Sequence, residues 1–212
     1  MRLRHFVAAL ALAAGGMSTA QAGIINGGFE AGGLSGWGVF PGTEIVAVAG
    51  SDYISCCGVT GTAAQLANHF AAFGGGNLPN ISTLSQIFDT VTDQRYVLSF
   101  DAGALGGGNQ TSFVDLFEAD GGRLIASNSA VLTANNNLGS TFRHFTLAFT
   151  AASGITRVAF RVDPFTDSVD GILDNVSVSA VPEPAAWALM LSGFILVGGA
   201  MRRRGPMTAV AA

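Results

Sequence analysis

The chain has 212 residues and a formal net charge of −4 at pH 7, and all ten of its basic residues are arginine. This length allows one domain of ordinary size plus targeting segments. The mean hydropathy of +0.45 reflects apolar residues gathered at the two ends, which must be set aside before the middle is interpreted. Between residues 23 and 181, five Arg stand against thirteen Asp and Glu, a formal charge of −8. Because so acidic a domain repels phosphate backbones, nucleic acid is not expected as a partner.

The first 22 residues have the layout of a secretory signal peptide. Arg2 and Arg4 form a basic start, and an apolar run follows over residues 6–14. That run is too short to span a bilayer, which requires about 20 apolar residues, so we predict cleavage rather than anchoring. Small residues flank Gln21 in the pattern that signal peptidase accepts. The residues predicted to define the cleavage site are Ala20, Ala22 and Gly23.

The C-terminal segment combines a proline-containing start, an apolar stretch and a basic end. Residues 185–201 carry no charge, and they lie between a Pro-Glu-Pro motif and three consecutive arginines. As a helix this stretch would reach about 26 Å, close to the roughly 30 Å of a bilayer hydrocarbon core. Because arginines favour the cytoplasmic side, the sequence predicts a single transmembrane helix over 185–201, a cytoplasmic tail at 205–212 and an exported domain.

Taken together, residues 182–204 resemble the PEP-CTERM sorting signal of exopolysaccharide-producing Gram-negative bacteria. The resemblance rests on the Pro-Glu-Pro motif, the Trp187-Ala188 pair, Gly193-Phe194 and the arginine cluster. It implies that an exosortase-type enzyme removes the tail, so that the protein is anchored in the inner membrane transiently and then reaches the cell surface or the extracellular space. A plain single-span anchor is the alternative. The predicted sorting motif comprises Pro182, Glu183, Pro184, Trp187, Arg202, Arg203 and Arg204.

Residues 23–180 show short apolar runs separated by Gly, Asn, Asp and Ser, which is typical of an all-β fold. Tyr96, Leu98 and Phe100 share one strand face, and Asp120-Gly121-Gly122 is a tight-turn signal. Only residues 62–73 could form a turn or two of helix, with a loop as the alternative. Strands are predicted over residues 44–48, 81–91, 95–101, 112–119, 123–127, 141–150, 155–162 and 171–180. An antiparallel sandwich of two sheets buries such strands best.

This domain also resembles jelly-roll domains similar to carbohydrate-binding modules. The segments that carry the resemblance are residues 25–30 with Trp37, which are similar to the opening strand, and residues 172–178, which are similar to the closing strand. The resemblance implies a jelly-roll β-sandwich in which these two strands lie side by side. It also implies a structural calcium ion held by one acidic residue from each strand, by position Glu30 and Asp174. Carboxylate oxygens suit Ca²⁺; the alternative is that both residues are solvent-facing turn residues.

No catalytic constellation stands out in the sequence. His69 and His144 are the only histidines after the signal peptide, and neither has a motif-grade Ser or Cys beside it. The glycine-rich segments lack the Lys of a phosphate-binding loop. We therefore predict no catalytic residues and no enzymatic activity. An envelope hydrolase that uses a carboxylate or His144 is the weaker alternative.

Aromatic side chains are the groups that would stack against sugar rings. Tyr53, in a loop rich in Gly, Ser and Cys, and Trp37, in the opening motif, are the candidate ligand contacts. The alternative to a ligand contact for Trp37 is a position in the core. The adjacent Cys56 and Cys57 cannot join distant loops, and a vicinal disulfide, two small half-buried residues and a partner thiol elsewhere all stay open.

The sequence thus predicts an exported surface or matrix protein without enzymatic activity. Sorting by an exosortase-type system and a contribution to biofilm structure through contact with exopolysaccharide form the main hypothesis. A carbohydrate-binding module with a defined glycan ligand is the alternative. The expected partners are signal peptidase, an exosortase-type enzyme and exopolysaccharide.

Overall fold

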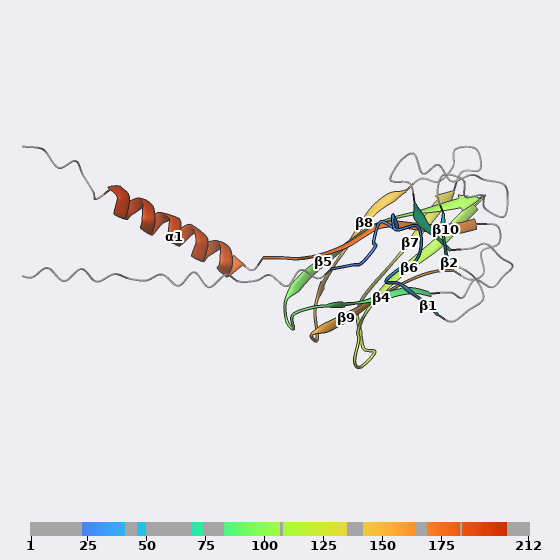
Figure 1. Cartoon of the computed structure of the whole chain (residues 1–212), viewed down its shortest axis with the longest axis horizontal. Helices are drawn as coiled ribbons and strands as arrows, with labels where there is room; N and C mark the ends of the chain where they lie inside the picture. Colours follow the sequence, from blue (N-terminus) through green and yellow to red (C-terminus); the bar gives the residue numbers. More distant parts are fainter. Residues whose placement is uncertain are drawn as a thin grey trace, which may run out of the picture.

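Ten strands in two antiparallel sheets, followed by one helix, form the described part of the chain (Figure 1). The computed structural model describes residues 23–40, 46–49, 69–73, 83–106, 108–134, 142–163, 169–182 and 184–202. The strands are β1 (Gly38–Phe40), β2 (Val46–Ala49), β3 (Phe70–Phe73), β4 (Thr83–Asp89), β5 (Arg95–Gly106), β6 (Gly108–Glu118), β7 (Leu124–Ala134), β8 (Arg143–Thr150), β9 (Ile155–Val162) and β10 (Val169–Ala180), and the helix is α1 (Pro184–Arg202).

The two sheets have five strands each and pack face to face. Sheet A has the order β1-β4-β9-β6-β7, and sheet B has the order β2-β3-β10-β5-β8. Every strand pairing within them is antiparallel. The predicted all-β antiparallel sandwich is therefore confirmed, and its connectivity is consistent with a jelly roll.

The main core lies between the sheets and follows from the alternation of side chains along each strand. Tyr96, Leu98 and Phe100 are buried as predicted, and the ring of Tyr96 stacks on Phe149 with 5.4 Å between centroids. Burying an aromatic or aliphatic side chain of this size contributes about 1.5 to 3 kcal/mol. A second, smaller cluster lies on the opposite face of sheet B; its members are Phe70, Ala72, Leu105 and Ile172.

The opening segment forms turns rather than the strand that its sequence suggests. Asn26 and Phe29 have positive φ angles of 52° and 56°, which a strand does not allow. The segment nevertheless lies beside β10, because the Val176 N–H donates to the Gly27 carbonyl at 3.0 Å. A Cβ at Gly27 would meet the Val176 carbonyl oxygen, so only glycine allows this approach. The side-by-side placement of the opening and closing segments is thus observed.

Other differences from the predicted elements have simple physical causes. Residues 70–73, predicted as potential helix, form β3, because pairing with β2 and β10 buries all four side chains. Residues 62–68 of the same stretch lie outside the described residues. The turn predicted at residues 120–122 is confirmed: the Gly122 N–H donates to the Glu118 carbonyl at 2.9 Å, and Gly122 has a φ of 67°.

Helix α1 confirms a helix where residues 185–201 were predicted to form one, and it points away from the sandwich (Figure 1). Within the described parts of the chain, no helix combines the length and apolar character needed to cross a membrane. The transmembrane character predicted for residues 185–201 stays a prediction. The signal peptide at 1–22, the tail at 205–212, Glu183, Arg203 and Arg204 lie outside the described residues, and the roles predicted for Gly23, Pro182, Pro184, Trp187 and Arg202 stay predictions.

Candidate functional site

A cluster of carboxylates lies on sheet B, where β10 meets the opening segment. Asp101 of β5 is paired in register with Asp174 of β10 on one side and with His144 of β8 on the other. The β10 register shifts between Asp174 and Ser177, and Asn175 in this bulge has a positive φ of 51°. A bulge of this kind re-aims the side chains next to it. Here it brings the Asn175 amide onto Asp101, with Nδ2 donating to Oδ2 at 2.9 Å.

Asp174 is the most unusual member of this cluster. It is 1% exposed; its Oδ1 accepts the Asn175 N–H at 2.6 Å, and its Oδ2 has no hydrogen-bond partner. Burial raises the pKa of Asp174 to about 6, the Asn175 hydrogen bond opposes this change, and repulsion from Glu30 and Asp101 adds to it. A buried oxygen without a partner costs free energy that a bound cation would recover.

Glu30 lies close to Asp174, as the resemblance implied. A Cβ built on Gly28 would lie 3.8 Å from Glu30 Cγ and 3.9 Å from the Oδ1 atoms of both Asp174 and Asn175, so these side chains converge on one backbone position. Glu30 Oε2 also lies 3.3 Å from Nδ1 of His69. In the described residues, no group of three or more His, Cys, Asp or Glu could hold a metal ion. A calcium ion here would depend on two carboxylates together with amide and backbone oxygens, a donor set that fits its chemistry.

Ser99, His144 and Asp101 form a hydrogen-bonded array on the outer face of sheet B. Ser99 Oγ lies 3.1 Å from His144 Nε2, and His144 Nδ1 lies 2.8 Å from Asp101 Oδ1. Sequence reasoning missed this array because its members come from different strands. The signal that was available is the position of Ser99 and Asp101 on the polar side of an alternating strand.

The array has the order of a catalytic triad, but the backbone groups that the structure describes beside it are already paired. The Ser99 backbone is paired with Thr146 on one side and Ser177 on the other. At the neighbouring bulge, the Asn175 N–H donates to Asp174 and the Val176 N–H donates to Gly27. Acyl transfer depends on free donors aimed at the developing negative charge. In the described residues, the array is a polar network that fixes Asp101.

The outer face of sheet A carries a second arrangement, in which the strand registers align residues in three rows across the sheet. Alternation places these residues opposite the core-facing Leu84, Val114 and Val158. The first row contains Phe40, Thr83, Arg161, Phe113 and Ser129; the middle row contains Gly38, Ser85, Ala159, Asp115 and Ser127; the third row contains Ile87, Arg157, Phe117 and Leu124. We call these fourteen residues the sheet A face. Two rows with large side chains thus flank a middle row of mostly small ones.

Two arginines on this face lie over aromatic rings. The guanidinium carbon of Arg161 is 4.1 Å from the centroid of Phe113, and that of Arg157 is 4.7 Å from the centroid of Phe117. Arg161 also donates from Nε to Asp115 Oδ2 at 3.3 Å. Arg157 forms no ion pair with a described carboxylate, and its buried Nε has no acceptor.

The sheet A face also exposes apolar side chains. Phe40 is 75% exposed and Ile87 is 60% exposed, and Leu124 at the far end of the third row is half exposed. Sequence reasoning named only Tyr53 and Trp37 as aromatic ligand contacts and so missed this face. A signal was present: Phe113 and Phe117 share a side of their strand with Asp115, while Val114 and Leu116 occupy the other side.

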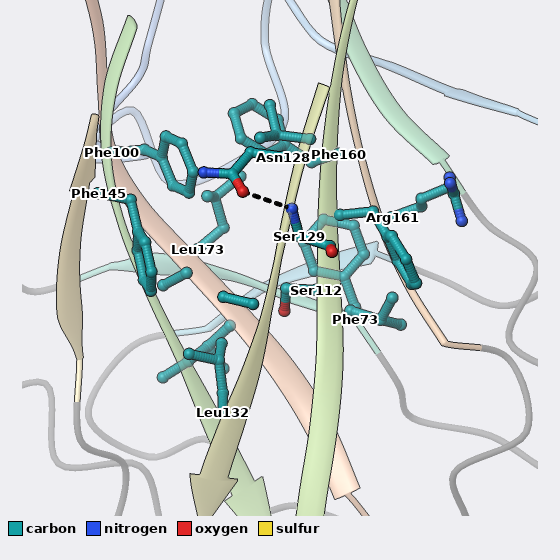
Figure 2. A pocket seen from close by; sticks show the side chains of 16 residues that line it. Phe73, Phe100, Ser112, Asn128, Ser129, Leu132, Phe145, Phe160, Arg161 and Leu173 are labelled. Carbon is teal, nitrogen blue, oxygen red and sulfur yellow. Dashed lines mark hydrogen bonds between the residues drawn. The ribbon is translucent and has the colours of Figure 1, made fainter. Parts of the chain in front are cut away.

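A small pocket lies between the two sheets, near β7 and β8 (Figure 2). It is lined by core side chains such as Phe100 and Phe145, which stack with 5.5 Å between centroids, and by the edge of β7, where Asn128 Oδ1 accepts the Ser129 N–H at 2.8 Å (Figure 2). Its volume is about 30 Å³. That space holds about one water molecule and no sugar ring.

The structure describes only one of the two predicted ligand contacts. Trp37 is 9% exposed; its indole packs between Phe29 and Phe160, and its Nε1 donates to the Asn26 carbonyl at 3.1 Å. The indole has no free face for a sugar. Trp37 is therefore a core residue, which was the alternative interpretation of its position. Tyr53 lies outside the described residues, as do Cys56 and Cys57.

Comparison with solved structures identifies the type of fold. A module named TmCBM61, solved with β-1,4-galactotriose, matches with a TM-score of 0.56 and 15% identity over 76% of this chain and 99% of the module. The K3 cleaved adhesin domain of Lys-gingipain from Porphyromonas gingivalis W83 matches with a TM-score of 0.55 and 18% identity, over 74% of this chain and 98% of that domain. The chain folds as a jelly-roll-type β-sandwich.

A third similar structure shows how widely this fold is used. The enzymatically active domain of tailspike protein 4 from bacteriophage CBA120 matches with a TM-score of 0.52 and 15% identity, covering 76% of this chain. This chain spans only 21% of the length of that structure. No family model matches the sequence, and no curated protein matches it. Similarity at this level of identity shows the fold alone, so the function must be argued from the surface.

Proposed function

We propose that the chain is a carbohydrate-binding module that acts outside the cell, and that a glycan lies across the strands on the sheet A face. The observation that carries this proposal is the arrangement of the face in rows. Large side chains occupy the first and third rows, four residues apart along β4, β9 and β6, which is about 13 Å at roughly 3.3 Å per residue. The small residues between them leave space for a chain of sugar rings.

The chemistry of the face suits sugars. Exposed Phe40 and the edges of Phe113 and Phe117 offer apolar surface for the apolar faces of pyranose rings. Hydroxyl groups beside them can exchange hydrogen bonds with sugar hydroxyls; they belong to Thr83, Ser85, Ser127 and Ser129. The fold similarity to a module solved with galactotriose supports the proposal without deciding it.

Binding of the purified full-length chain to a panel of soluble polysaccharides tests this function. We expect saturable binding that weakens about tenfold on Phe40→Ala, because an exposed aromatic ring would lose a stacked sugar. Val91→Ala is the matched control, since Val91 is half exposed and lies in the turn after β4, away from this face. If both variants bind as the wild type does, the glycan does not lie on the sheet A face.

A structural calcium ion at Glu30 and Asp174 is part of the proposal. It is supported by the buried, unpartnered Asp174 Oδ2 and by the convergence of both carboxylates near Gly28. A bound cation would hold the opening segment to β10 and would not take part in any reaction. Calcium should raise the melting temperature of the wild type and leave that of Asp174→Asn unchanged. An equal shift in both proteins would place the ion elsewhere.

Export and sorting form a separate proposal that rests on the two ends of the sequence. Helix α1 forms next to the Pro-Glu-Pro motif and ends among the arginines, as a cleavable sorting tail would require. On this proposal signal peptidase and an exosortase-type enzyme process the chain, and the mature module reaches the surface or an exopolysaccharide matrix. Mass spectrometry of the protein recovered from its host tests this, because an intact C-terminus on the mature surface protein would contradict processing.

A further inference from the structure

We infer that the glycan bound on the sheet A face is an acidic polysaccharide, whose repeating units carry carboxylate groups such as those of uronic acids. This inference rests on the proposed function, and it adds the chemical class of the ligand. It is carried by Arg157 and Arg161, which neither the fold comparison nor the sequence motifs single out.

Charge is distributed unevenly over the surface of the domain. Residues 23–181 carry a formal charge of −8 with only five arginines, so most of the domain repels anions. Two of those five arginines lie on the sheet A face, on the same strand β9. The face itself holds one carboxylate, that of Asp115, which contacts Arg161. The fourteen residues of the sheet A face therefore carry a formal charge of +1 on an acidic domain, and the exposed carboxylate of Asp89 lies beyond the third row, two residues after Ile87. A positive surface favours an anion there over other positions.

Arg157 has no anionic partner among the described residues. Its guanidinium group lies against Phe117, its Nε is buried without an acceptor, and no described carboxylate pairs with it. By contrast, Arg123 lies outside the three rows and pairs with Glu118 at 3.1 Å. A half-buried cation without an anion is costly. A ligand carboxylate would supply the missing acceptor, whereas a neutral sugar would supply only hydroxyl oxygens.

The orientation of the two guanidinium groups also suits an acidic polymer. Contact with the aromatic rings holds both guanidinium groups in place, and this reduces the entropy lost when they bind a ligand. A planar guanidinium group matches the two oxygens of a carboxylate. Because Arg157 and Arg161 are four residues apart on one strand, their backbones lie about 13 Å apart. Two cations at that separation suit a polymer with repeated carboxylates better than a single acidic sugar.

The experiment compares polygalacturonate with the same polymer after full methyl esterification, using the purified full-length chain. Esterification keeps the sugar backbone and removes its charge. We expect the wild type to bind polygalacturonate at least tenfold more tightly than the ester, with an affinity that falls as salt is added. Arg157→Gln and Arg161→Gln should each weaken binding of the acidic polymer about tenfold, which is the usual scale for one charge-assisted contact. Arg123→Gln is the matched control and should bind as the wild type does.

The outcomes separate the inference from the proposed function. Equal binding of the acid and its ester, or of any neutral glycan instead of the acid, overturns the inference and leaves carbohydrate binding intact. Absence of binding to every acidic and neutral polymer overturns both. Loss of affinity in Arg123→Gln equal to that in the other two variants would indicate general charge attraction and would also overturn the assignment. Arg157→Lys, which keeps the charge and the fold but loses the planar fork, should bind with intermediate affinity.

Discussion

The outer faces of the two sheets differ in kind although the same alternation produces both. The sheet A face exposes phenylalanine and isoleucine side chains and two arginines held against rings. Around Ser99 the outer face of sheet B presents hydroxyl groups and the carboxylate cluster, and none of its described side chains is a large exposed apolar group. The core needs only one side of each strand, so the other side is available for function. In this chain we propose one outer face as the ligand surface, whereas the other carries a polar network around Asp101 beside the small apolar cluster of Phe70 and Ile172.

We expect the largest effect from a substitution in the carboxylate cluster on sheet B, and the quantity that changes is the free energy of unfolding. Replacing Asp174 with Asn removes a buried charge, keeps the acceptor for the Asn175 N–H, and places an amide donor toward Glu30 and Asp101. Because burial raises the pKa of Asp174 to about 6, we expect a gain of about 2 to 3 kcal/mol in calcium-free buffer at pH 8. Chemical denaturation measures it, with Asp89→Asn, at the exposed end of β4, as the control. A loss of stability would mean that the charge is favourable without a cation.

The same carboxyl group predicts a pH dependence. The pKa of Asp174 is higher in the folded protein, about 6, than its ordinary value of 3.8. Its stabilising contribution is therefore complete below about pH 4 and is lost as the pH rises through about 6. In calcium-free buffer, the advantage of Asp174→Asn over the wild type should grow from pH 5 to pH 8 by up to about 2 kcal/mol. An advantage that does not change with pH would rule out this titration as the cause.

A matched pair of substitutions, one on each outer face, tests which face binds the glycan. Ser85 and Ser99 both point outward, Ser85 from the middle row of the sheet A face and Ser99 from sheet B. Phenylalanine is a good strand former at either position. Ser85→Phe should fill the space between the two large rows and weaken glycan binding about tenfold or more, whereas Ser99→Phe should change it less than twofold. Calorimetric titration with the tightest-binding glycan measures both affinities, and the reverse order would place the ligand on sheet B.

The smallest expected effect concerns the exposed ion pair between Arg123 and Glu118. Exposed pairs of this kind contribute about 0 to 1 kcal/mol. Arg123→Gln should therefore shift the free energy of unfolding by less than about 0.5 kcal/mol. Thermal denaturation measures the shift, and a large loss would disqualify this variant as the control for the two arginines of the sheet A face.

The sequence predicted those features that depend on local pattern. Strand β9 was predicted with its observed bounds because its alternation and the preceding Gly154 are both clear. The opening segment was predicted wrongly as a strand, because its turns depend on the positive φ angles of Asn26 and Phe29 and on the close approach of Gly27 to β10, which the local pattern does not reveal.

The candidate sites depend on pairing between distant strands, and this limited what the sequence could predict. Glu30 and Asp174 were brought together by resemblance to a fold and not by any local spacing. The rows of the sheet A face join β1, β4, β9, β6 and β7, and no single segment reveals them. Only the repeated spacing of four residues, between Phe113 and Phe117 and between Arg157 and Arg161, hinted at a shared face.

Amide NMR shifts of the full-length chain, recorded during titration with the tightest-binding glycan, identify the face that binds the ligand. If the sheet A face is the ligand surface, the shifts concentrate on β4, β6 and β9, with the guanidinium signals of Arg157 and Arg161 among the most affected. Shifts concentrated on β5, β8 and β10 would contradict this assignment and place the ligand on sheet B.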